Sequence, residues 1–150
     1  MPYTMYEILL VIHSYFRWVI LVLWIFSLFF LIQNSFKREI SNVLKKFHKF
    51  SSISISIQFL FGVILYFLSP LVSQGMENMK EAMKNKEIRY FLVEHWVSMF
   101  ICLGIFHFLN AKLKKDPHSE KIFTILWSGY LIIALLFIYG IPHLQRPPFR

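Results

Sequence analysis

Four long apolar runs dominate the sequence and constrain its fold more than any other feature. They cover residues 8–32, 53–72, 90–109 and 122–141. An α-helix needs about 20 apolar residues, at ~1.5 Å rise per residue, to cross the hydrocarbon core of a bilayer. Because lipid offers no partners for backbone N–H and C=O groups, each run is expected to cross as a helix.

The connections between these runs are too short for a separate soluble domain. We therefore predict an all-α protein with one domain over residues 1–150, a four-helix transmembrane bundle with spans at about 8–32, 53–72, 90–109 and 122–141. The composition agrees, because 57% of the residues are hydrophobic and 17 are Phe. A soluble domain has a much lower apolar content.

The connecting segments contain two amphipathic stretches. Residues 40–50, ISNVLKKFHKF, place Phe and Leu on one face and Lys on another, which predicts a short helix in the membrane interface. Residues 76–89, MENMKEAMKNKEIR, predict a second short helix lying on the opposite surface of the membrane.

The net charge of +8 has a topological meaning in a membrane protein. Nine Lys and Arg residues lie in the first and third connections, and six lie in the second connection and the C-terminal segment. The positive-inside rule then predicts that both termini lie on the outer, periplasmic side. The basic residues are expected to meet lipid headgroups, so we predict no nucleic-acid partner.

Four ionisable residues within the apolar runs mark the candidate site. His13 and Arg17 are four residues apart in the first run, so they share one helix face. Glu94 and His95 are adjacent in the third run. Polar and charged side chains are costly inside a bilayer and usually serve function there.

The two histidines are predicted to lie at one depth. Each is five residues inside the outer end of its run, which corresponds to ~7–8 Å below the outer interface. Two imidazoles at equal depth on different helices are suited to bind one haem iron from its two sides. We therefore expect haem b as cofactor, with His13 and His95 as metal ligands and with Arg17 and Arg89 binding the haem propionates.

Glu94 is the predicted catalytic residue, because a carboxylate beside His95 can orient the imidazole or carry a proton. The expected function is a b-type cytochrome that exchanges electrons with the quinone pool or with a partner subunit. His107 lies on a different helix face from His95, since twelve residues leave the two side chains about 120° apart. We therefore expect His107 to take no part in haem ligation, and His48 is expected in the basic loop.

Two alternatives remain open. The chain fits a cofactor-free accessory subunit of a larger membrane complex or a homo-oligomer, in which an Arg17–Glu94 ion pair fixes the helix register. It also fits a proton-relay enzyme or carrier, such as a HemJ-like oxidase, that uses Glu94 and His95. A zinc site without porphyrin is less favoured, because it would normally need a third His or Cys ligand. Whether the chain is an enzyme in its own right stays open.

The segments IHSYFRW, QFLFGVILYFLSP, RYFLVEHWVSM and LIIALLFIYGIP resemble a family of small four-helix, cytochrome b-like membrane proteins of Bacteroidetes-type bacteria. The resemblance covers nearly the whole chain except the two basic loops and the extreme tail. It implies a four-helix fold in the bacterial inner membrane and points to His13, Arg17, Arg89, Glu94 and His95. Relatives carry a histidine two residues before Gln58, where this chain has Ser56, so the resemblance does not imply a second haem.

Overall fold

The computed structural model describes residues 4–140 and is helical nearly throughout. Its elements are α1 (Met5–Lys37), α2 (Asn42–Leu68), α3 (Pro70–Glu77), α4 (Met79–Lys84), α5 (Lys86–Arg89), the π-helix η1 (Tyr90–Glu94), α6 (His95–Lys115) and α7 (Ile122–Gly140). No strand occurs within the described residues. The predicted all-α bundle is therefore confirmed.

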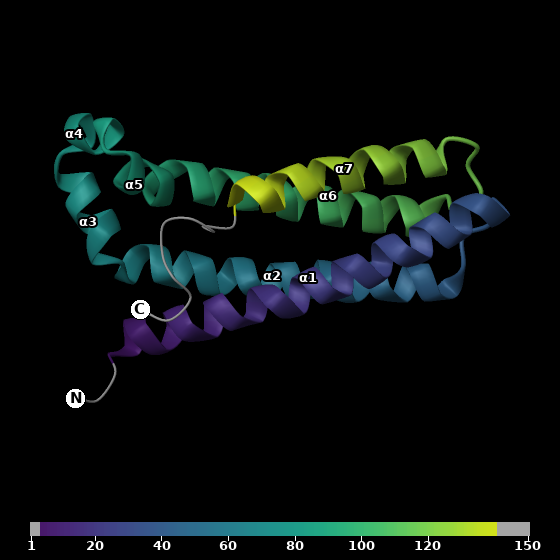
Figure 1. Cartoon of the computed structure of the whole chain (residues 1–150), viewed down its shortest axis with the longest axis horizontal. Coiled ribbons are helices and arrows are strands. Elements are labelled where there is room, and N and C mark those ends of the chain that lie inside the picture. The colour runs from purple at the N-terminus through teal and green to yellow at the C-terminus, as the bar shows by residue number, and fades with distance from the viewer. Residues whose placement is uncertain (1–3, 141–150) are drawn as a thin grey trace.

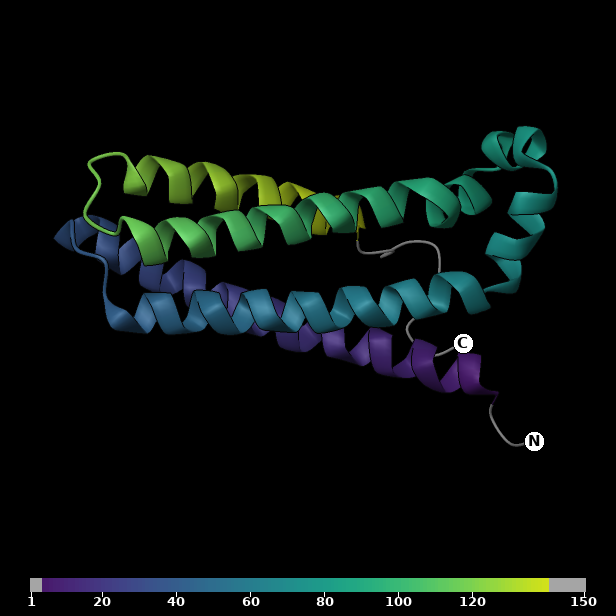
Figure 2. The same cartoon turned by 180° about the vertical axis from the view of Figure 1, so that it is seen from behind.

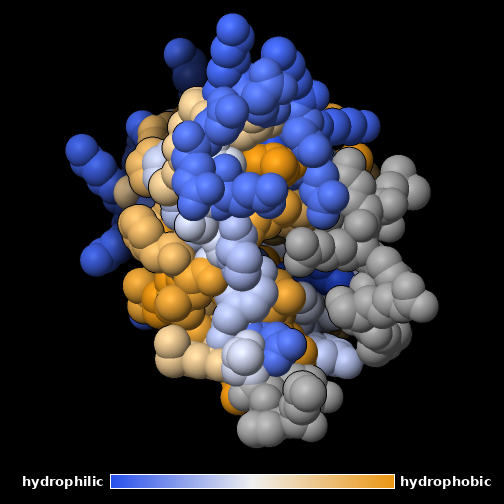
Figure 3. All heavy atoms as spheres, turned by 90° about the vertical axis from the view of Figure 1, so that its left-hand side faces the viewer, coloured by the Kyte–Doolittle hydropathy of each residue, from blue (hydrophilic) through white to orange (hydrophobic). Residues whose placement is uncertain are grey.

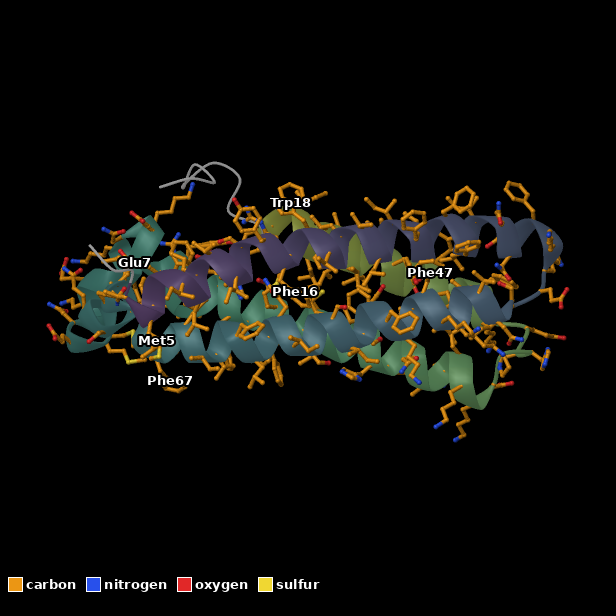
Figure 4. The ribbon with its side chains drawn as sticks, turned by 90° about the horizontal axis from the view of Figure 1, so that it is seen from below. Met5, Glu7, Phe16, Trp18, Phe47 and Phe67 are labelled. Atoms are coloured by element: carbon orange, nitrogen blue, oxygen red, sulfur yellow. The ribbon has the colours of Figure 1, made fainter. Side chains whose placement is uncertain are left out.

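Within residues 4–140, four helical segments are long and apolar enough to cross a membrane, namely α1, α2, the continuous segment Lys86–Lys115 and α7. Large apolar side chains on them remain exposed, such as Phe67 at 77%, Ile138 at 70% and Leu131 at 63%. Figure 4 shows Phe67 and Trp18 projecting away from the bundle. A soluble monomer rarely exposes so much apolar surface, so the chain is a multi-pass membrane protein with these faces against lipid.

The helices form two pairs that lie against each other as layers. Helices α1 and α2 make one pair, and α6 and α7 make the other (Figures 1 and 2). The pairs approach closely at the end that carries the α1–α2 and α6–α7 turns, and they spread apart towards α3. The short helices α3, α4 and α5 bridge the open end (Figure 1).

Local sequence signals set the helix ends. Thr4 and Glu7 form a capping box at the start of α1, and Arg38 ends this helix with a positive φ of 53°. Ser41 caps α2, and its backbone N–H donates to Asn34 Oδ1, which fixes the turn between the first two helices. Ser69 followed by Pro70 ends α2 and starts α3, because proline has no N–H for a continuing helix.

The second span differs from its predicted position of 53–72. Helix α2 begins at Asn42 and ends at Leu68, so most of the predicted interfacial stretch 40–50 is its first turns. Consequently His48, expected in a basic loop, is fully buried. The amphipathic pattern was correct for a helix, but the helix continues into the bundle rather than lying in the interface.

His48 belongs to a closed hydrogen-bond network where the two layers meet. Its Nε2 lies 3.1 Å from the Phe106 carbonyl oxygen, which can only accept, so Nε2 carries the proton. The other nitrogen, Nδ1, therefore accepts from the Tyr130 hydroxyl at 2.9 Å, and Ser27 donates to that same hydroxyl. Trp24 stacks on Tyr130. The side-chain polar atoms of His48, Tyr130 and Ser27 are therefore paired within the chain, as hydrocarbon requires, whereas the buried Nε1 of Trp24 has no partner among the described residues.

The opposite end of the molecule is a charged cap. Figure 3 looks onto this end and shows hydrophilic residues gathered over α4 and α5. They include Lys80, Glu81, Lys84, Lys86 and Glu87. The predicted surface helix over residues 76–89 is therefore broken into parts of α3, α4 and α5, with Asn78 and Asn85 capping the breaks.

The close packing of α6 against α7 yields a stability prediction with a matched control. A Cβ added at Gly129 would lie 2.7 Å from Leu109 Cδ1 and 3.1 Å from its Cγ, so the fully buried Leu109 side chain or the helices would have to shift. Gly129→Ala should therefore lower the free energy of unfolding in detergent by about 1–3 kcal/mol. Gly104→Ala, whose Cβ meets nothing within 4 Å, should leave stability unchanged or raise it by up to ~1 kcal/mol. Equal effects of the two substitutions would contradict this packing.

Candidate functional site

The two candidate histidines face each other across the space between the layers. His13 lies in the N-terminal third of α1, and His95 is the first residue of α6. Their ring centroids lie 6.5 Å apart, and the ring planes are inclined by 72°. The structure therefore brings together the two side chains that the depth argument had paired.

A π-helix immediately before His95 sets the orientation of this segment. Residues five apart are about 140° apart in an α-helix, but they lie nearly above each other in a π-helix with its i→i+5 bonds. In η1 this alignment pairs Arg89 with Glu94 and Tyr90 with His95. Single π-turns are rare and frequently occur at functional sites.

His95 is held in one tautomer by the end of α7. Its Nδ1 lies 2.9 Å from the carbonyl oxygen of Gly140, and the Tyr90 hydroxyl donates to the same oxygen at 2.8 Å. Because a carbonyl oxygen only accepts, Nδ1 carries the proton and Nε2 keeps a free lone pair. No described residue hydrogen-bonds that Nε2, so it is available to a ligand.

His13 is positioned by helix α2. A Cβ added at Gly62 would lie 3.3 Å from His13 Cε1, so this glycine gives the imidazole its room. Gln58 on the same helix donates to the His13 backbone oxygen at 2.8 Å. The buried atoms His13 Nδ1 and Gln58 Oε1 have no hydrogen-bond partner among the described residues.

A cavity of about 460 Å³ lies around the two imidazoles. All four spanning segments and α3 contribute to its walls, which run along α1 from Tyr6 to Leu21. Arg17 is the charged residue in this lining, and no Asp or Glu of the described chain lines the cavity with it. Its buried Nε has no described partner, while its guanidinium carbon lies 5.5 Å from the Trp18 ring centroid.

Arg89 and Glu94 lie outside the cavity lining and bind each other. Arg89 Nε lies 2.7 Å from Glu94 Oε1, and its Nη1 donates to the Met83 carbonyl at 3.0 Å. The Tyr139 hydroxyl donates to the other Glu94 oxygen. Glu94 therefore makes no hydrogen bond to His95 or Arg17 in the described structure, and it fastens the start of the third span to the end of α7.

Two residues of the site were not singled out in the sequence. Tyr90 is one of several aromatic residues near the ends of the spans, and Gly140 contributes only its backbone carbonyl. The spacing of five between Tyr90 and His95 and between Arg89 and Glu94 is a signal for a π-turn, but five-residue spacings are common by chance. The position of Gly140 depends on where α7 ends beside α6, which a single sequence does not encode locally.

Other predicted positions lie away from this cavity. His107 Nε2 pairs with the Ser56 hydroxyl at 2.9 Å and does not line the cavity. Within residues 4–140 no group of three or more His, Cys, Asp or Glu is placed to hold a metal ion. The site thus offers two imidazoles and an arginine around a mostly apolar cavity.

The chain was compared with family models, curated proteins and solved structures, and none of the three comparisons gave a match. What the fold and the site define is a class, a multi-pass helical membrane protein with an internal cavity between two helix pairs.

The hydrogen bond from His95 to Gly140 predicts a measurable tautomer. In cofactor-free protein in detergent, at a pH where histidines are neutral, the ¹⁵N spectrum should contain one imidazole with a protonated Nδ1 and a bare Nε2. This signal should disappear in His95→Gln and persist in His118→Gln, whose side chain lies in the α6–α7 connection. A spectrum in which His95 carries its proton on Nε2 would contradict the arrangement.

Proposed function

We propose that the protein is a b-type membrane cytochrome that holds one haem between the α1–α2 and α6–α7 pairs. His13 and His95 would hold the haem iron, near the α3–α5 end of the bundle. By the positive-inside argument this end faces the periplasm of a bacterial inner membrane. The protein would then exchange electrons between a bilayer or subunit donor and an acceptor at that face.

The separation of the imidazoles is the observation that carries this proposal. With metal–nitrogen bonds of about 2.0–2.1 Å, the centroids of two imidazoles bound to opposite sides of one ion lie about 6.4 Å apart. The observed separation is 6.5 Å, and the ring planes are free to differ in rotation about the axis through the ion. This match in spacing supports the binding of one iron by both rings.

The remaining lining supports the same cofactor. The fixed tautomer leaves Nε2 of His95 unprotonated, as iron ligation requires. The Gly140 carbonyl accepts a hydrogen bond from the other ring nitrogen, Nδ1, as is usual for a metal-bound histidine. Arg17 has no acidic partner in the cavity, so an anionic group of the ligand would compensate its charge. Haem carries two carboxylates, and Arg17 would bind one of them.

When bound, haem supplies one-electron chemistry, and the chain's own residues fix where this happens. Arg17 binds and orients the cofactor, His13 and His95 set its height in the bilayer, and the apolar lining excludes water. Arg89 would not bind a propionate, because it already donates to Glu94 and to the Met83 carbonyl. Glu94 would act through the end of α7 by holding Gly140 beside His95.

The two alternatives receive less support from the geometry. The accessory-subunit alternative expects an Arg17–Glu94 ion pair that fixes the helix register. In the structure Glu94 binds Arg89 instead. A proton relay through Glu94 and His95 lacks a hydrogen bond between them within the described residues. Neither alternative explains why two imidazoles and an unpaired arginine surround a cavity.

The absorption spectrum of variants tests the proposal. Protein purified from haem-sufficient cells should show a Soret band, and dithionite should sharpen the visible bands. His13→Ala and His95→Ala should each reduce bound haem by more than roughly tenfold, because even outer partners of metal ligands change affinity by 10–100-fold. Size-exclusion elution and helical circular dichroism should stay unchanged.

His107→Ala is the matched control, since His107 is also within the third span but lies away from the cavity. It should bind haem like the wild type. A wild-type protein without a Soret band, or equal haem content in all four proteins, would reject the cytochrome proposal.

A further inference from the structure

Two polar residues of the cavity lining lie at one level of the bundle, on facing helices. Arg17 is four residues after His13 in α1, and Gln58 is four residues before Gly62 in α2. Gly62 lies against the His13 imidazole. Because four residues are about one helical turn, both Arg17 and Gln58 lie about 6 Å from the imidazole level, towards the α1–α2 turn (Figure 1).

The unpaired atoms of these two residues have opposite hydrogen-bonding character. Gln58 Nε2 donates to the His13 carbonyl oxygen at 2.8 Å, and this bond fixes the orientation of the side-chain amide. The other amide atom, Oε1, is therefore an acceptor, and Arg17 Nε is a donor. Both atoms are buried without a partner among residues 4–140, and Gln58 is only 7% exposed. A ligand that pairs both atoms must supply an acceptor and a donor at this level.

The opposite side of the imidazoles offers no countercharge to an anionic ligand. Towards α3 the described lining has apolar and neutral side chains, among them Leu10, Leu65, Leu71 and Val72. Arg89 is outside the lining and already donates to Glu94 and to the Met83 carbonyl. An anionic group in this cavity therefore finds its countercharge, among the described residues, at Arg17.

We propose that Arg17 and Gln58 form a subsite for the two carboxyl groups of a dicarboxylic tetrapyrrole, whose acidic edge points towards the α1–α2 turn and away from the α3–α5 end. Arg17 binds one carboxylate. A second carboxylate has no countercharge in the cavity, so this group stays protonated and its O–H donates to Gln58 Oε1. The choice of a tetrapyrrole rests on the proposed function, whereas recognition of its carboxyl groups needs no iron.

Binding of a metal-free porphyrin tests the subsite without iron ligation. Haem-free protein in detergent is titrated with protoporphyrin IX and with its dimethyl ester, and binding is followed by porphyrin fluorescence anisotropy. The ester keeps the ring but has no ionisable carboxyl group and no O–H donor. The wild type should bind the acid roughly tenfold or more tightly than the ester, as expected for a hydrogen bond to a charged group. Equal affinities, or no binding of either porphyrin, would overturn the subsite.

Two arginine variants test the orientation of the acidic edge. Arg17→Leu should abolish the preference for the acid, because it removes the countercharge. Arg89→Leu is the matched control and should keep the preference, since the ratio of the acid and ester affinities cancels any general loss of binding. A preference that survives Arg17→Leu, or that is lost to the same extent in both variants, would overturn the orientation.

Infrared spectra test the role of Gln58. Protoporphyrin IX labelled with ¹³C at both carboxyl carbons should show one protonated and one ionised carboxyl group when it is bound at neutral pH. Gln58→Leu should shift the C=O band of the protonated group to higher frequency, because its hydrogen bond is lost, and should leave the carboxylate bands in place. Two ionised carboxyl groups in the wild type would contradict the hydrogen bond to Gln58.

Haem content and porphyrin preference together separate this inference from the cytochrome proposal. If the wild type contains haem but binds protoporphyrin IX and its ester alike, the subsite fails and the cytochrome stands. If a preference that depends on Arg17 occurs in a protein that never binds haem, the subsite stands and the cytochrome fails.

Discussion

Hydrocarbon offers no hydrogen-bond partners, and the rest of this structure depends on how the chain meets that constraint. Where the two helix pairs touch, His48, Tyr130 and Ser27 satisfy one another and the Phe106 carbonyl. Where the pairs spread, His13 Nδ1, Arg17 Nε and Gln58 Oε1 have no partner among the described residues, and beside Tyr130 the Nε1 of Trp24 also has none. Leaving each such buried group unpaired costs about 1–3 kcal/mol, so a ligand that pairs them would stabilise the fold.

The contrast between these two regions separates a structural histidine from a functional one. His48 has both ring nitrogens bound and no free lone pair, so it can only hold the helices together. His95 has one nitrogen bound by Gly140 and the other free, and it faces a second imidazole across a cavity. The short helices α3, α4 and α5 connect the two layers at this end, where the layers lie apart. The cavity therefore follows from the order of the helices and not from any one residue.

Much of the fold was predictable from the sequence, because a long apolar run directly indicates a helix that lies in the hydrocarbon core. The four spans and the pairing of His13 with His95 follow from run length and depth alone. The burial of His48 was missed, because an amphipathic stretch beside a span has the same pattern whether it lies in the interface or extends the helix. The roles of Tyr90 and Gly140 were also missed, because they depend on the π-turn η1 and on where α7 stops beside α6. The predicted roles of Glu94 and Arg89 are redirected by that same turn, which brings the two residues together.

The central claim is that two imidazoles from α1 and α6 bind one iron. Electron paramagnetic resonance of the oxidised protein, after reconstitution with one equivalent of haemin, tests it most directly. The account predicts a low-spin ferric signal that accounts for the added haem, because two strong nitrogen ligands pair the iron electrons. A high-spin signal, or haemin that stays free in the detergent phase, would contradict it.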